Sequence, residues 1–360
     1  MSYSPSSVEF PVTLTPGTIE DAKLIPKMNS IADLESVSPY PRATKPFWQR
    51  IDSAVRYLPT EHRQAAYLLF SSVIYFGDRM VDDSWRFLLR ELKREYGLDD
   101  ENLLEDALVL PEDPANFKRF VHCNDIKGRL DTDKHPRLWG ASDAVRDACL
   151  SKLLDSSPRV PRKLRKTKPS SILHFINRKY WILLYDYALS GRSLSSEISK
   201  TQNLAQSLNV DPKIVAIVQI MTEEAERLIR KECGSRSRLI YSVKLDERFK
   251  VNSPKCQLFE GNKNKNSLKS VRRLCTWFFQ NLIRKDPEYE NTLQLNRDMT
   301  YGFFNTGLTL VTPNCPSNSI PLLWYNRFGR YEGPYPRIES RITQTTRGDR
   351  YYLGLLRRLM

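Results

Sequence analysis

The chain has 360 residues, of which 40% are hydrophobic, and a formal net charge of +14. This length and apolar share allow a sizeable core in one large domain or two, which excludes a fully disordered chain. The positive charge favours anionic partners such as nucleic acid, nucleotides or phosphorylated sugars, although solubility alone would also explain it.

Cysteine usage and hydropathy indicate the compartment. Six cysteines are scattered without a close pair, so the sequence suggests neither a zinc site nor a disulfide framework. Residues 1–7 lack the basic start and apolar core of a signal peptide, and no apolar stretch has membrane-spanning length. We therefore expect a protein of the reducing cytoplasm with no membrane partner.

Residues 1–45 are rich in Ser, Thr and Pro, and we expect an extended or disordered arm because repeated prolines interrupt regular elements. Two helices should come next. Pro59 and Thr60 precede a helical pattern that runs to Phe76, and apolar residues at helical spacing predict another helix over 81–96. These helices dominate a mainly helical N-terminal part at residues 46–157.

Weaker signals come after these helices, including a short strand around Phe120–Cys123 and a helix near Ala141–Leu154. Residues 158–170 are basic and proline-rich and contain no acid between Arg159 and Lys168, which is typical of a solvated linker. Such cations attract phosphates without reading bases, so any nucleic-acid contact would be non-specific and salt-sensitive. The candidate nucleic-acid-binding residues here are Arg162, Lys163, Arg165 and Lys166.

Residues 171–330 show an α/β rhythm. Apolar runs at Trp181–Tyr185 and Ile214–Met221 predict strands, Thr222 can cap a following helix, and Leu239–Leu245 predicts a further strand. Strands joined through helices predict an α/β fold with a mainly parallel sheet flanked by helices. In such sheets ligands bind at the carboxyl ends of the strands.

The strand at Trp181–Tyr185 leads through Asp186 and a small-residue turn into a helix that begins near Ser193. Gly191 would let a ligand approach the backbone, and free N–H groups at the helix start would face an anion. An ordinary strand-to-helix turn explains the same pattern.

This stretch resembles the ribose-phosphate loop of type I phosphoribosyltransferases. That loop runs from an apolar strand through two acids and three variable residues to Thr or Ser, Gly, a variable residue, and Thr or Ser. Asp186 matches the second acid, whereas Tyr185 stands at the position of the first. The resemblance implies that Asp186 holds a ribose hydroxyl and is the candidate catalytic residue. The implied ribose-phosphate-binding residues are Asp186, Leu189, Ser190, Gly191, Arg192 and Ser193.

Near the end of the chain, an apolar strand leads into Asn-x-Pro, a second Asn and Pro-x-x-Trp. The residues at these positions are Asn314, Pro316, Asn318, Pro321 and Trp324. This segment resembles the close of the phosphoribosyltransferase-like core effectors of prokaryotic conflict systems, which act in antiphage defence. With the loop and the N-terminal helices, the resemblance covers roughly residues 47–330.

The resemblance implies binding of phosphoribosyl pyrophosphate or a nucleotide, magnesium as a possible cofactor, and a partner protein of the defence system. Two functions stay open. One is an effector that transfers or cleaves a glycosidic bond, which the retained Asp186 and Gly191 favour. The other is a non-catalytic module with a degenerate pocket that senses a nucleotide or binds nucleic acid or a partner, which Tyr185 favours. The motif residues do not indicate which side chains would bind a metal ion.

Residues 331–360 form a basic, aromatic tail. Aromatic side chains interleaved with arginines can stack on bases and bind phosphates. A tail that packs along the body of the protein, or along a partner, would have the same composition.

Overall fold

The computed structural model describes residues 24–41, 45–97, 106–111, 119–120, 122–124, 177–207, 209–234, 237–259, 265–286, 299–313, 315–316, 318–327 and 331–336. The chain forms two compact units. Described residues between 24 and 78 and between 247 and 336 make the first, and those between 79 and 246 make the second. The chain leaves the first unit after residue 78 and returns to it at residue 247, after the sheet of the second.

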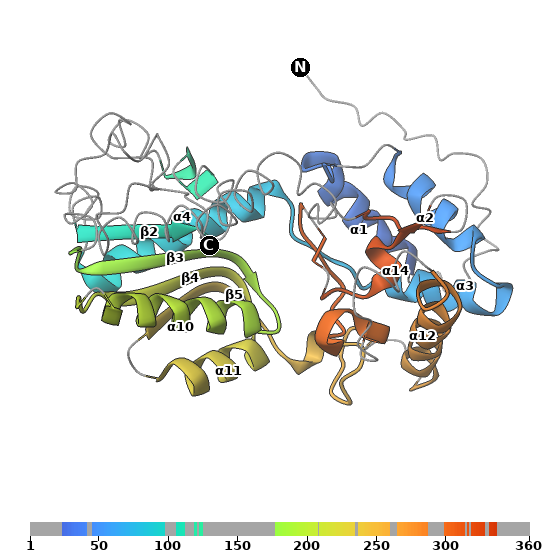
Figure 1. Cartoon of the computed structure of the whole chain (residues 1–360). Coiled ribbons are helices and arrows are strands. Elements are labelled where there is room, and N and C mark those ends of the chain that lie inside the picture. Colours follow the sequence, from blue (N-terminus) through green and yellow to red (C-terminus); the bar gives the residue numbers. More distant parts are fainter. Residues whose placement is uncertain are drawn as a thin grey trace, which may run out of the picture. The chain divides into compact units, whose positions relative to one another are not determined.

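The second unit is built on a four-stranded parallel sheet (Figure 1). Its strands are β2 (Ala107–Pro111), β3 (Tyr180–Ala188), β4 (Lys213–Thr222) and β5 (Ser237–Leu245), in that order across the sheet. In the β3–β4 pair Tyr180 lies beside Lys213 and Ala188 beside Met221, so the two strands end level. The expected mainly parallel sheet, with the two central runs as neighbours, is confirmed.

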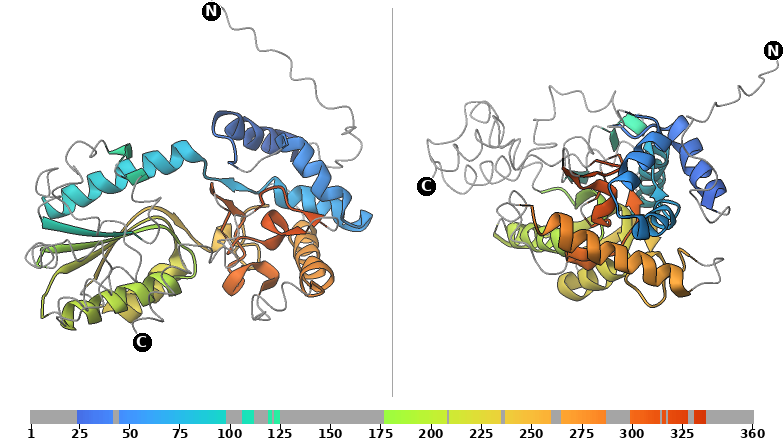
Figure 2. Two further views of the ribbon diagram at one scale, coloured as in Figure 1. Left: turned by 45° about the horizontal axis from the view of Figure 1, so that its top comes forward. Right: turned by 90° about the vertical axis from the view of Figure 1, so that its right-hand side faces the viewer.

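Helices cover both faces of this sheet (Figure 2). α10 (Arg192–Ser207) and α11 (Glu223–Cys233) pack on one face, where they enclose Trp181, Leu183 and Val218 in an apolar cluster. Strand alternation turns Gln219 to the opposite face, where its amide Nε2 donates to the Val81 carbonyl of α4 (Asp78–Tyr96) at 2.8 Å.

The first unit is mainly helical. Its longer helices are α1 (Leu24–Val37), α2 (Phe47–Arg56), α3 (Thr60–Phe70) and α12 (Lys265–Phe278). A π-helical turn (Phe279–Ile283) continues α12. The shorter elements are β1 (Ile74–Tyr75), β6 (Leu310–Val311), α14 (Pro321–Trp324), β7 (Asn326–Arg327), β8 (Tyr331–Glu332) and single 3-10 turns at Glu247–Phe249, Met299–Tyr301 and Phe303–Asn305.

Segments distant in sequence close the core of this unit. β1 pairs in parallel with β6, and β7 pairs with β8 in antiparallel orientation. The Phe278 ring of α12 meets Tyr331 edge-on with ring centroids 4.7 Å apart. Tyr331 and Tyr335 are fully buried, so the first residues of the expected basic, aromatic tail are core residues and cannot stack on bases.

Two further expectations need correction. Residues 24–37 of the expected arm form α1, with Leu24 and Met28 buried, because Pro26 lies in the first helical turn, where proline removes no helical hydrogen bond. Residues around Phe120 are helical and not a strand, and the Asn124 side-chain amide donates to the Phe120 carbonyl at 2.8 Å.

Helix α3 also stops at Phe70, earlier than expected, because the chain must extend at Ile74 to pair with Leu310. The expected helix at Ala141–Leu154, the linker at 158–170 and the tail beyond residue 336 lie outside the described residues. Over the part of the chain that is described, none of the helices combines the length and apolarity needed to cross a membrane.

Candidate functional site

The candidate site is the turn between β3 and α10. β3 ends at Ala188 and α10 begins at Arg192. The Ser195 N–H donates to the Gly191 carbonyl at 2.9 Å, which makes this the opening hydrogen bond of the helix. The N–H groups of residues 192–194 precede it and have no acceptor within the helix. The expected junction of a strand's carboxyl end with a helix N-terminus is therefore present.

Gly191 has a structural reason to be glycine. Its φ of +76° lies in the left-handed region, which disfavours residues with a Cβ atom. A Cβ atom at this position would also lie 2.8 Å from the Cα atom of Ala225 in α11. Substitution of Gly191 would thus disturb the packing of the turn on α11, so it would not be a clean test of ligand binding.

A single hydroxyl holds the turn against the next helix. Thr222 Oγ1 donates to the Leu189 carbonyl at 2.7 Å and accepts from the Ala225 N–H at 3.0 Å. Thr222 is fully buried at the N-cap of α11. The cap was expected from the sequence, but its contact with Leu189 was not. The level ends of β3 and β4 explain the contact, because they bring both helix starts to one edge of the sheet.

The two helix starts differ in charge. The first turn of α10 contains no acid, whereas that of α11 contains Glu223, Glu224 and Glu226. Carboxylates in a first helical turn offset the partial positive charge of the helix N-terminus. An added anion is therefore better accommodated at α10, where the exposed Arg192 supplies a further positive charge.

The two positions of the expected acid pair lie in different surroundings. Tyr185 is 4% exposed and belongs to the apolar cluster beneath α10 and α11. Its neighbour Asp186 is half-buried, and its Oδ1 accepts from the Tyr187 N–H at 2.7 Å. A carboxylate at position 185 would be buried among apolar side chains, which is costly without a partner. Asp186 is thus the one acid of the motif that this site retains.

Most other predicted site residues gather at the turn. Ser190 is half-buried, and Arg192 and Ser193 are exposed, whereas Leu189 is buried and Thr222 engages its carbonyl. The structure does not describe the four linker residues that were predicted to bind nucleic acid. Within the described ranges, no group of three His, Cys, Asp or Glu side chains is placed to hold a metal ion.

The described part of the second motif, which leaves out Asn314, forms a tight corner in the first unit. Pro321 opens α14, and the Trp324 indole Nε1 donates to the Ser319 carbonyl at 2.8 Å. The Thr306 hydroxyl donates to the Asn318 carbonyl at 3.0 Å. The buried Trp324 and these backbone contacts give the motif a structural role in that unit.

Comparison with protein families decides the affiliation. A family model described as PRTase-CE matches residues 58–337. The chain belongs to the PRTase-CE family. The match includes the β3–α10 turn and the corner at α14, and it confirms the resemblance to phosphoribosyltransferase-like effectors. Searches of curated proteins and of solved structures gave no match. The PRTase-CE assignment therefore rests on the family model, together with a sheet and turn of the expected arrangement.

Proposed function

We propose that this chain is an effector of a prokaryotic defence system that binds a phosphoribosyl compound or nucleotide through its phosphate at the β3–α10 turn. The observation that carries the proposal is the left-handed Gly191 between the carboxyl end of β3 and the acid-free N-terminus of α10. Backbone N–H groups and the helix dipole favour a phosphate at such a place. The family match adds that the turn belongs to a phosphoribosyltransferase-like protein.

In this proposal the N–H groups of residues 192–194 face the phosphate, and Ser190 and Ser193 donate hydroxyl hydrogen bonds to it. Asp186 accepts from a ribose hydroxyl, since an ionised carboxylate is a strong acceptor. A defence-system partner protein and a cytoplasmic location belong to the same proposal, and the free thiols of the described cysteines support a reducing compartment. Magnesium is expected only from the resemblance, and no step here depends on it.

The fate of the bound ligand distinguishes two functions. Transfer or cleavage of a glycosidic bond requires stabilisation of a cationic sugar, which Asp186 and the bound phosphates would supply by charge. A non-catalytic nucleotide-sensing module needs only the binding step. The burial of Tyr185 in the apolar cluster favours the second function, because it removes one of the two carboxylates that normally hold the ribose.

Calorimetry with phosphoribosyl pyrophosphate and the common nucleotides tests the binding step. The Ser190→Ala/Ser193→Ala double variant should bind more weakly, because two hydroxyl donors to the phosphate are lost. Arg192→Ala should also weaken binding. Lys200→Ala is the matched control, because Lys200 is exposed on the same helix two turns away. Equal affinities in all four proteins would place the ligand elsewhere.

The same samples decide between the two functions. Chromatography of the samples detects release of pyrophosphate or of a free base from a bound ligand. Such release would establish a glycosidic-bond enzyme, and Asp186→Asn should then abolish turnover. Tight binding without release would establish the sensing module. A folded wild type that binds none of these compounds would contradict the proposal.

A further inference from the structure

The chain around α12 is strongly basic. Between residues 261 and 285 the sequence contains seven cationic residues and no acid. They are Lys263, Lys265, Lys269, Arg272, Arg273, Arg284 and Lys285. A segment of one charge sign attracts anions, but which of its side chains are available depends on the helix face that each occupies.

The Arg272 side chain is engaged in hydrogen bonds within the first unit. Its Nε atom donates to the Val251 carbonyl at 2.8 Å, and its Nη2 atom donates to the Ser253 carbonyl at 2.7 Å. It therefore braces the turn at residues 251–253 and is a poor candidate for a partner contact.

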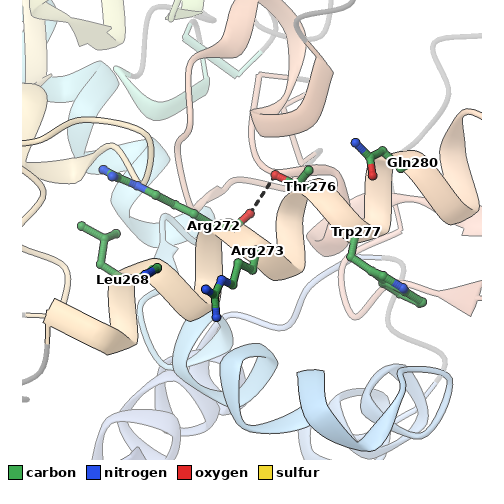
Figure 3. Close-up of a pocket in the computed structure, with 7 residues that line it drawn as sticks. Leu268, Arg272, Arg273, Thr276, Trp277 and Gln280 are labelled. Atoms are coloured by element: carbon green, nitrogen blue, oxygen red, sulfur yellow. Dashed lines mark hydrogen bonds between the residues drawn. The ribbon is translucent and has the colours of Figure 1, made fainter.

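Lys269 and Arg273 are available instead. Both side chains are exposed, and no hydrogen bond or ion pair joins either of them to another described residue. Lys269, Arg273 and Trp277 succeed one another at intervals of four residues, so they lie along one face of α12. Figure 3 shows Arg273 and Trp277 extending on the same side of the helix, away from Arg272.

This face borders a hollow of about 610 Å³ that is lined by side chains of α12 and by Gln280 of the π-helical turn that continues it. The Trp277 indole is half-buried, and its ring lies 5.0 Å, centroid to centroid, from the His62 imidazole of α3. That contact fixes one side of the indole and limits its rotation. The exposed amide of Gln280 lies one turn further along the helix.

We propose that the face formed by Lys269, Arg273 and Trp277 of α12 and by Gln280 of the following π-helical turn binds single-stranded nucleic acid. Exposed cations track the phosphates of such a strand, and a held aromatic ring provides a surface on which a base can stack. An amide side chain can donate to and accept from base edges. A partner bound by ion pairs alone, such as an acidic polypeptide, would make no stacking contact with the Trp277 indole. The presence of the indole beside the cations therefore favours a nucleic acid. The site is separate from the β3–α10 turn and does not rest on the proposed function.

Fluorescence anisotropy with labelled oligothymidylate and the full chain tests this proposal. Lys269→Ala/Arg273→Ala should weaken binding about tenfold near 0.1 M salt and reduce the slope of log affinity against log salt by about 1.4, which is two phosphate contacts on a single strand. Trp277→Leu should weaken binding about fivefold or more with the slope unchanged. Trp277→Phe, which keeps an aromatic ring, should lose less affinity for the oligonucleotide than Trp277→Leu.

The matched control is Arg227→Ala/Lys231→Ala. It removes two exposed cations from α11 in the other unit, and circular dichroism and thermal melting confirm that each variant is folded. Cross-linking of an oligonucleotide that contains 5-bromouracil should modify a peptide that includes Trp277. Equal losses in the control and the α12 variant would overturn the site, as would cross-links elsewhere only. Displacement by polyglutamate with no effect of Trp277→Leu would assign the face to an acidic protein partner and also overturn the proposal.

Discussion

Thr222 Oγ1 donates to the Leu189 carbonyl oxygen at 2.7 Å, so the N-cap of α11 also anchors the turn that precedes α10. One buried hydroxyl thus holds two neighbouring strand-to-helix junctions together. The shape of the candidate phosphate site therefore depends on a residue that makes no contact with the proposed ligand.

Thr222→Val keeps the side-chain volume and removes both hydrogen bonds. Because a buried Leu189 carbonyl and the Ala225 N–H would lose their partner, we expect a loss of about 1–3 kcal/mol in the free energy of unfolding. Thr222→Ser retains the hydroxyl and should lose only about 1 kcal/mol through the missing methyl group. Urea denaturation measures both, and equal losses in the two variants would show that the hydroxyl contributes nothing.

Gly191→Ala should destabilise the second unit whether or not a ligand is present. The left-handed backbone costs about 1–2 kcal/mol for a residue with a Cβ atom, and the close approach to Ala225 adds about 1–3 kcal/mol of overpacking. Gly97 is the matched control, because its φ is +62° but a Cβ atom there would meet nothing within 4 Å. Gly97→Ala should therefore show the backbone cost alone when unfolding is monitored by circular dichroism.

Arg50 is buried in the first unit, where it forms an ion pair with Glu35 and donates to the Pro334 and Lys45 carbonyls. Arg50→Ala would leave Glu35 buried and unpaired, so we expect a loss of about 3–5 kcal/mol. Replacing both partners, in Glu35→Leu/Arg50→Met, should cost less than the single change.

The control for this prediction is Arg56→Ala on the same helix, which breaks an ion pair between the exposed Arg56 and the half-buried Asp52. Such a pair contributes little, so stability should change by at most about 0.5 kcal/mol. If Arg50→Ala were as mild as Arg56→Ala in thermal unfolding, the buried pair would not be a determinant of the fold.

Glu226 should make the second unit sensitive to acid. Burial alone would raise the pKa of this carboxyl, but hydrogen bonds and ion pairs from Lys244 and Arg230 outweigh burial and lower the pKa below its ordinary 4.5. The folded state therefore binds this proton less readily than the unfolded state. The stabilisation is present above pH 4.5 and is lost as pH falls through the lower folded pKa.

Glu226→Gln removes this titration, so its stability should fall less steeply than that of the wild type as the solution is acidified below pH 4.5. Urea midpoints measured across that range test the difference. Identical slopes for the two proteins would show that Glu226 does not contribute to acid sensitivity.

Local patterns determined much of the second unit. The apolar run at Trp181 predicted β3 because a strand buried on both faces needs apolar residues throughout, and the Thr222 cap predicted the start of α11. β2 was missed, since Ala107–Pro111 is short and ends in proline, and its pairing with Tyr180–Leu184 is a contact over a long stretch of sequence. The end of α3 was misplaced for a similar reason, because Ile74 pairs with Leu310.

In the candidate site, too, some features follow from the local sequence and others from tertiary packing. The sequence by itself determined the order of strand, acid, glycine turn and helix, because each of these depends on residues close together in the chain. Only the tertiary structure decided that Gly191 is required by Ala225, that Tyr185 belongs to the core, and that Thr222 reaches Leu189. The contacts of Gly191 with Ala225 and of Thr222 with Leu189 join residues more than thirty positions apart in the sequence. The burial of Tyr185 depends on how α10 and α11 cover the sheet. Packing of this kind depends on which helix lies over which strand, and no local pattern of residue types specifies that arrangement.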